Sequence, residues 1–129
     1  MFGPLTVPFG AVMLHNVVKL KKGVTQADVE LAMGEMCNVV KNTYGDDDGG
    51  FIGGQVYKYT GFVSEEGSFD SGNLTDDHIA IVTYWKSFEQ HEKSHADAAF
   101  KEEFDALKQY ASDAYELGYE MLWQGTPED

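Results

Sequence analysis

The sequence predicts an α+β fold in which strands and helices follow the order β-α-β-β-α-β. Two kinds of periodicity support this order. Apolar residues alternate in four segments, as in half-buried strands, and recur every three or four residues in the segments between them, as in amphipathic helices. The length of 129 residues suits one domain. We expect an N-terminal arm over 1–10, where prolines and glycines cluster, and one domain over 11–129.

The first strand is predicted from Ala11 to Lys21, and its even-numbered residues form the more uniformly apolar face. Neighbouring residues of a strand point to opposite faces. We therefore expect Asn16 to face the helices and His15 to lie on the other side of the sheet. A helix with Thr25 as its N-cap should follow and end near Tyr44, because apolar residues recur there with helical spacing.

The second strand is predicted from Phe51 to Val63, and the glycines near its start indicate a β-bulge or a close backbone approach. A polar, turn-forming loop should occupy 64–77 before a strongly apolar third strand over 78–86.

Serine 87 should cap a short helix over 87–95, and a longer helix should then reach Ala111. The fourth strand, over 113–124, has the clearest alternation, with Trp123 on its apolar face.

This order of elements is the split βαβ arrangement of ferredoxin-like folds, with one four-stranded antiparallel sheet and both helices on one face. The other face would then expose tyrosines, tryptophan and apolar residues of the third strand. A monomer rarely leaves so large an apolar patch uncovered. We therefore predict a homodimer in which two copies cover this face.

The charge balance excludes several classes of protein. The chain has 9 basic residues, all lysine, against 22 acidic ones, and its net charge is −13. Nucleic-acid binding and binding to anionic membranes both require a basic surface, so we expect neither. The sequence has no apolar run of 18 residues and no basic, signal-like N-terminus, so we expect a cytoplasmic protein.

Cofactor motifs are missing from the sequence as well. Cys37 is the only cysteine, which excludes an internal disulfide and a multi-cysteine metal site. The sequence contains no glycine-rich phosphate loop and no dinucleotide fingerprint. We therefore expect no cofactor.

Two stretches resemble the dimeric α+β barrel proteins, a group that includes antibiotic-biosynthesis-type monooxygenases and stress-responsive A/B barrel proteins. The string Asn16-Val-Val-Lys-Leu-Lys-Lys-Gly23, followed by Thr25, resembles their first strand and helix start. The string Val82-Thr-Tyr-Trp-Lys-Ser87, together with Phe88 and His91-Glu-Lys-Ser-His95, resembles their third strand and the helix after it.

The resemblance implies a cavity between the sheet and the two helices of each protomer. Members of the group oxidise aromatic substrates without metal or flavin, degrade haem or cyclise polyketides, and several have no known activity. Asn16 matches a strand-one asparagine of the haem-degrading members. His95 lies near the second histidine of the cyclase-type members.

The candidate catalytic residues are His95, His15 and Asn16. His95 lies where it could cap the cavity mouth and act as a general acid or base. His15 is an alternative base, and Asn16 or a tyrosine could stabilise an oxyanion. His91 and His95 have the i, i+4 spacing of a helical metal pair, but only His78 or Glu92 is close in the sequence as a third ligand, so we expect no metal site.

Aromatic, methionine and polar residues predict an apolar ligand-binding cavity, although core and dimer packing would also explain the aromatic residues. The expected lining residues are Asn16, Met33, Tyr57, Tyr59, Trp85, His91, His95, Phe100, Phe104 and Tyr119. Three functions follow. The first is binding of a small apolar molecule, either an acyl chain or an aromatic compound. The second is a cofactor-independent enzyme of the monooxygenase or cyclase type, and the third is a structural or stress-related dimer without ligand.

Overall fold

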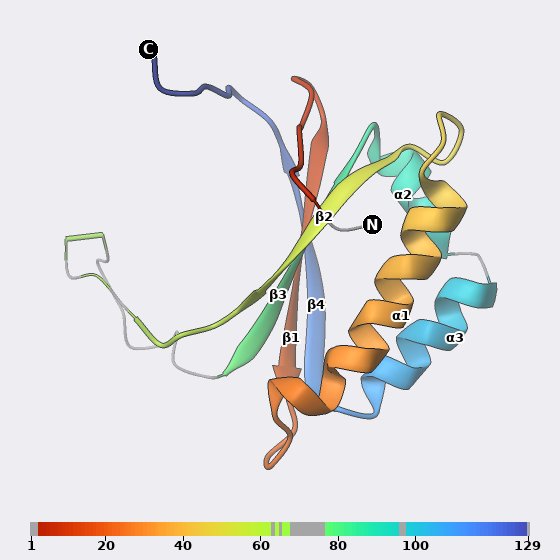
Figure 1. Cartoon of the computed structure of the whole chain (residues 1–129), viewed down its shortest axis with the longest axis vertical. Coiled ribbons are helices and arrows are strands. Elements are labelled where there is room, and N and C mark those ends of the chain that lie inside the picture. Colours follow the sequence, from red (N-terminus) through yellow and green to blue (C-terminus); the bar gives the residue numbers. More distant parts are fainter. Residues whose placement is uncertain (1–2, 63, 65, 68–76, 96–97, 129) are drawn as a thin grey trace.

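A computed structural model describes residues 3–62, 64, 66–67, 77–95 and 98–128. Its helices and strands follow the predicted order, with two helices between the third and fourth strands (Figure 1). The elements are β1 Val12–Leu20, α1 Gln26–Tyr44, β2 Phe51–Lys58, β3 His78–Trp85, α2 Phe88–His95, α3 Ala98–Lys108 and β4 Ala111–Glu120. The predicted α+β class is confirmed.

The four strands form one antiparallel sheet in the order β2-β3-β1-β4, and the helices lie against one of its faces (Figure 1). Strand β1 is therefore central, with β3 and β4 as its neighbours. In this register Asn16 lies opposite Ile81 of β3 and Glu116 of β4. Its even-numbered neighbours Leu14 and Val18 are buried in the core beneath the helices, as the alternation predicts.

The core fills the space between the sheet and helix α1. Its larger part joins strand residues to the apolar stripe of α1 and to α3: Val18, Val29, Ala32, Met33, Met36, Ile79, Ile81 and Leu107. A smaller part joins Leu14, Val40 and Trp85 near the start of α2. The site described below lies between the sheet and helices α1 and α3.

Strand β2 ends at Lys58 and not at Val63 as predicted; Val63 and most of the expected loop lie outside the described residues. Strand β3 begins at His78, and its last contact with β2 is the hydrogen bond from Tyr59 N to His78 O, 3.2 Å long. Residues beyond Tyr59 therefore have no β3 residue to pair with.

The end of the chain also differs from the prediction. Helix α3 ends at Lys108. Ala111, which was predicted to lie at the end of this helix, is the first residue of β4. Strand β4 ends at Glu120, opposite Val12, because β1 begins there and offers no further partner. Trp123 consequently lies beyond the sheet and is 79% exposed, where the sequence predicts a buried strand residue.

The glycines at the start of β2 act as predicted. The register with β3 shifts between Phe51 and Gly53, which is a β-bulge. A Cβ atom on Gly53 would overlap Leu5 of the N-terminal arm, so the arm crosses β2 where a side chain is missing. The amide of Gln124 donates a hydrogen bond of 2.8 Å to Val7 O, which ties the arm to the C-terminal segment.

The sheet face away from the helices is apolar and open in the protomer. The register places Tyr57, Tyr115, Leu117 and Tyr119 on this outer face, and each is 41–52% exposed. His15 lies on the same face, opposite Val82 of β3 and Leu117 of β4.

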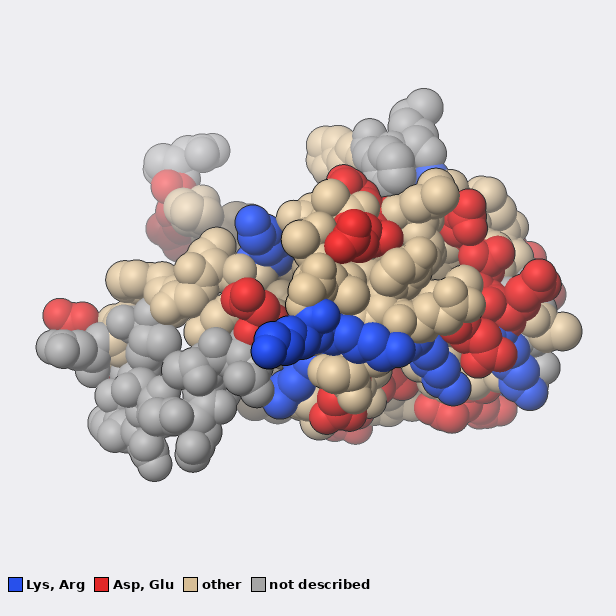
Figure 2. Space-filling model, turned by 90° about the horizontal axis from the view of Figure 1, so that it is seen from below, with Lys and Arg blue, Asp and Glu red and all other residues tan. Residues whose placement is uncertain are grey.

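Charged residues of both signs cover the underside of the molecule. Figure 2 shows a row of lysine side chains there, flanked by acidic ones. Lys19, Lys21 and Lys22 surround a shallow depression where β1 leads into α1. None of the described helices combines the length and apolar composition needed to cross a bilayer.

Candidate functional site

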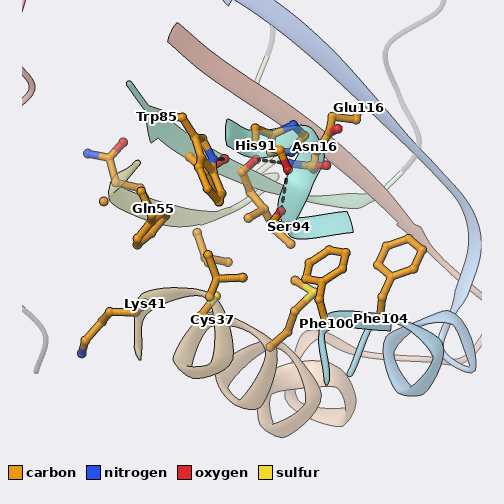
Figure 3. A pocket seen from close by; sticks show the side chains of 18 of the residues that line it. Asn16, Cys37, Lys41, Gln55, Trp85, His91, Ser94, Phe100, Phe104 and Glu116 are labelled. Carbon is orange, nitrogen blue, oxygen red and sulfur yellow. Dashed lines mark hydrogen bonds and ion pairs between the residues drawn. The ribbon is translucent and has the colours of Figure 1, made fainter. Parts of the chain in front are cut away.

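A cleft of about 1280 Å³ lies between the sheet and helices α1 and α3 (Figure 3). Its walls are mostly apolar. The apolar wall residues come from α1 (Met36, Cys37 and Val40), from the sheet (Val18, Ile81 and Trp85) and from α3 (Phe100 and Phe104). Burial raises the pKa of the Cys37 thiol, so the thiol is neutral and adds to the apolar wall.

Asn16 from β1, His91 from α2 and Glu116 from β4 lie together at the sheet side of this cleft (Figure 3). His95 from α2 lies beside Glu116 in the same group. His91 Nε2 lies 3.2 Å from Glu116 Oε2, and His95 Nε2 lies 3.9 Å from Glu116 Oε1. The Asn16 amide donates a 3.3 Å hydrogen bond to Ile81 O. We call these four residues the polar cluster.

The local sequence explains why both imidazoles face the cleft. His91 and His95 are one helical turn apart, so they lie on the same side of α2. Ser87 Oγ accepts a 3.2 Å hydrogen bond from Gln90 N and so satisfies one of the free amides at the start of α2. The Gln90 side-chain amide donates to the carbonyls of Asp47 and Asp48, at 3.0 and 3.2 Å, and anchors α2 to the turn before β2.

A row of aromatic rings fixes the orientation of the imidazoles. The His91 ring packs edge-on against Trp85, with centroids 5.2 Å apart, and edge-on against His95 at 4.4 Å. His95 stacks on Phe100 at 5.2 Å, and Phe100 stacks on Phe104 at 5.9 Å. The rings run from the buried core to α3, so they limit rotation of both histidines.

Glu116 is an ionised acceptor whose side chain is partly exposed at the cleft. Burial acts to raise the pKa of its carboxyl group. Hydrogen bonds from His91 and Asn16, with the electrostatic attraction of both imidazole rings, outweigh burial and hold the pKa below its usual range. His91 Nδ1 is buried and has no hydrogen-bond partner among the described residues, although Glu92 Oε1 lies 3.4 Å away.

The sequence matches no protein-family model and no curated protein. Solved structures do match the fold. SnoaB of Streptomyces nogalater, a cofactor-independent oxygenase, is 13% identical with a TM-score of 0.61, over 92% of this chain and 99% of SnoaB. A hydroxynitrile lyase of Passiflora edulis is 8% identical with a TM-score of 0.64, over 92% of this chain and all of the lyase.

A third structure is a dimeric protein of unknown function with a ferredoxin-like fold, from Bacteroides fragilis. It is 11% identical with a TM-score of 0.57, over 87% of this chain and 97% of its own. The chain has the ferredoxin-like α+β fold of these structures. The predicted structural resemblance is thereby confirmed, and at these identities it concerns the fold alone.

Within this fold, six of the expected site residues line the cleft: Asn16, Trp85, His91, His95, Phe100 and Phe104. Four others lie elsewhere. Met33 is buried in the core under α1. Tyr57 and Tyr119 lie on the outer face, opposite Ala80 and Met13. Tyr59 stacks on His78 beyond the end of β2, with ring centroids 4.6 Å apart.

His15 also lies away from the cleft, on the outer face, because it alternates with Asn16 along β1. The residue that sequence reasoning missed is Glu116. Its alternation with Tyr115 and Leu117 indicates that it lies on the opposite side of β4 from them. Its contact with the histidines depends on the pairing of β1 with β4, which the sequence does not reveal.

Proposed function

We propose that the protein binds a small, mostly apolar molecule, an acyl chain or an aromatic compound, in the cleft between the sheet and the helices. The observation that supports this most directly is that apolar side chains form most of the cleft wall, while the polar cluster lies together at its sheet side. Ligand sites commonly combine an apolar lining with a few polar groups that orient the guest. The apolar part of the guest would lie against Cys37, Phe100 and Phe104, and its polar end would meet the polar cluster.

The expected affinity follows from the area that such a guest would bury. Burial of apolar surface contributes about 25 cal/mol per Å², so an acyl chain of about 300 Å² would contribute about 7 kcal/mol before the costs of ordering. This corresponds to micromolar binding at best. The polar cluster would then select the orientation and head group of the guest.

A pair of variants on α1 tests this proposal. Cys37→Phe places a ring in the cleft, whereas Leu31→Phe adds a similar ring to a side chain that is 74% exposed on the same helix. We expect N-phenyl-1-naphthylamine and a fluorescent fatty acid to bind the wild type saturably. Cys37→Phe should weaken binding at least tenfold, and Leu31→Phe should not change it. Equal binding by both variants, or no saturable binding by the wild type, would refute the proposal.

We also infer that two copies pair through the outer face. The four half-exposed residues Tyr57, Tyr115, Leu117 and Tyr119 favour this, and a structural neighbour is dimeric. Light scattering should give about twice 14.3 kDa. Leu117→Lys should shift the protein toward monomer, and Leu31→Lys on α1 should not. A wild-type monomer at micromolar concentration would contradict the inference.

A second candidate function is acid–base catalysis on the bound molecule. The supporting observation is that His95 is 37% exposed at the cleft while Glu116 lies beside its Nε2. In this function His95 Nε2 takes a proton from an acidic C–H or O–H group of the guest, and Glu116 stabilises the imidazolium that forms. The fold is shared with a cofactor-independent oxygenase, which agrees with chemistry carried out by side chains.

Hydrogen–deuterium exchange into an aromatic carbon acid tests this candidate. The wild type should accelerate exchange of the α-protons of 2-tetralone in D₂O, and His95→Gln should abolish the acceleration. Lys93→Gln, an exposed change on the same helix, is the control. If the wild type exchanges no faster than buffer while it still binds the fluorescent probes, the acid–base function is wrong and the binding function stands.

A further inference from the structure

We propose that His91, His95 and Glu116 bind a divalent transition-metal ion, with Zn²⁺ as the best-fitting occupant. Among the described residues, these three bring one ligand atom each to within 4.8 Å of one another. Two come from adjacent turns of α2 and the third from β4, so rigid elements hold the donors on opposite sides of one point. The proposal goes beyond ligand binding and does not depend on which guest the cleft takes.

The distances suit a metal ion after small side-chain movements. Bonds of about 2.0–2.1 Å in a tetrahedral zinc site place neighbouring ligand atoms about 3.3 Å apart. Here the Nε2 of His91 lies 3.2 Å from Glu116 Oε2, the Nε2 of His95 lies 3.9 Å from Glu116 Oε1, and one ligand atom of each residue lies within 4.8 Å of the others. His95 is the more exposed of the two histidines, so a small shift of its ring along the face of Phe100 would close the remaining gap.

The surroundings of His91 provide an independent argument. Its side chain is 5% exposed, and its Nδ1 has no hydrogen-bond partner among the described residues. While Nε2–H donates to Glu116, Nδ1 is a buried acceptor with no donor among the described residues. A metal on Nε2 would move the proton to Nδ1, and Glu92 Oε1 lies 3.4 Å from it. Metal-bound histidines commonly donate their second N–H to a carboxylate in this way.

The donor set indicates the class of ion. Two imidazoles and one carboxylate suit Zn²⁺ and its neighbours among the divalent transition metals, whereas Mg²⁺ and Ca²⁺ prefer oxygen ligands. Three protein ligands also leave a fourth position, which in this structure would face the cleft. That position could receive water or the polar end of a guest.

Zinc binding and acid–base catalysis make opposite demands on His95, because a coordinated imidazole cannot take a proton on the same nitrogen. The two uses of the polar cluster therefore exclude each other. Metal titration and the deuterium-exchange assay, carried out on the same protein preparation, distinguish them.

The test is a titration of the full-length, chelator-treated protein with ZnCl₂ by calorimetry, and with CoCl₂ by visible absorption. We expect one zinc ion per chain, cobalt d–d bands that report on the coordination geometry, and no binding of MgCl₂. His95→Ala and Glu116→Gln should each weaken zinc binding at least tenfold. His15→Ala, which removes an imidazole from the outer face, should leave it unchanged.

Circular dichroism and thermal melting check that each variant is folded. Zinc should raise the melting temperature of the wild type and of His15→Ala, but not that of His95→Ala. Because His95 is partly exposed, its truncation keeps the test informative even if Glu116→Gln is unstable. No saturable binding at one ion per chain, or equal zinc affinity in the wild type and in His95→Ala, would overturn the proposal.

Discussion

Replacing Glu116 by alanine should lower the free energy of unfolding by about 2 kcal/mol. The 3.2 Å contact with His91 Nε2 is charge-assisted, and such bonds contribute about 1.5–3 kcal/mol. The substitution also leaves a buried imidazole without its acceptor, because the His91 side chain is 5% exposed. For a chain of this length, a loss of about 2 kcal/mol corresponds to a fall in melting temperature of about 7 °C.

A double-mutant cycle isolates the pair. Glu116→Ala, His91→Ala and the double variant should show a coupling free energy of about 1 kcal/mol or more. Urea unfolding can be followed by the fluorescence of buried Trp85 in a Trp123→Phe background, with chelator present and at one fixed protein concentration. If the losses of unfolding free energy in the two single variants sum to the loss in the double variant within about 0.3 kcal/mol, the side chains do not interact and the polar cluster is wrongly described.

Two further predictions concern stability. Leu107→Ala should cost about 2–5 kcal/mol in urea unfolding, because Leu107 is 2% exposed in the core, whereas Leu122→Ala at an 87% exposed position should change stability by less than about 0.5 kcal/mol. Equal effects would mean that the core is wrongly placed. Gly50→Ala should cost more than about 1 kcal/mol, since Gly50 has a φ of +75° and an added Cβ would overlap the Gln90 side chain. A melting temperature equal to that of the wild type would contradict this backbone geometry.

Faces could be predicted from the sequence because alternation is a local property. Asn16 and His15 fall on opposite sides of β1, as predicted, and the apolar stripe of α1 marks its buried side. The ends of the strands were harder to predict, because a strand ends where its partner strand has no further residue to pair with. The alternation of β4 continues to Trp123, but pairing ends at Glu120, where β1 has no further residue to offer.

The candidate site was only partly predictable for the same reason. The helical spacing of His91 and His95 is visible in the sequence, but the third member of their group comes from β4. Tyr57 and Tyr119 were expected in the cavity because aromatic composition does not indicate which face a strand residue occupies. Their register with β3 and β1 places them on the outer face.

The central position of β1 has a consequence for how the chain is made. Both neighbours of β1 lie far downstream, and among the described residues β2 pairs only with β3. Neither of the first two strands therefore has its partner in this sheet until residues 78–85 have left the ribosome. Until then the nascent chain carries two strands with unpaired edges, a state that favours aggregation and chaperone capture. Glu116 is synthesised later still. The polar cluster is therefore completed only when β4 adds to the edge of the sheet, so chains truncated before β4 would retain the two histidines without their carboxylate.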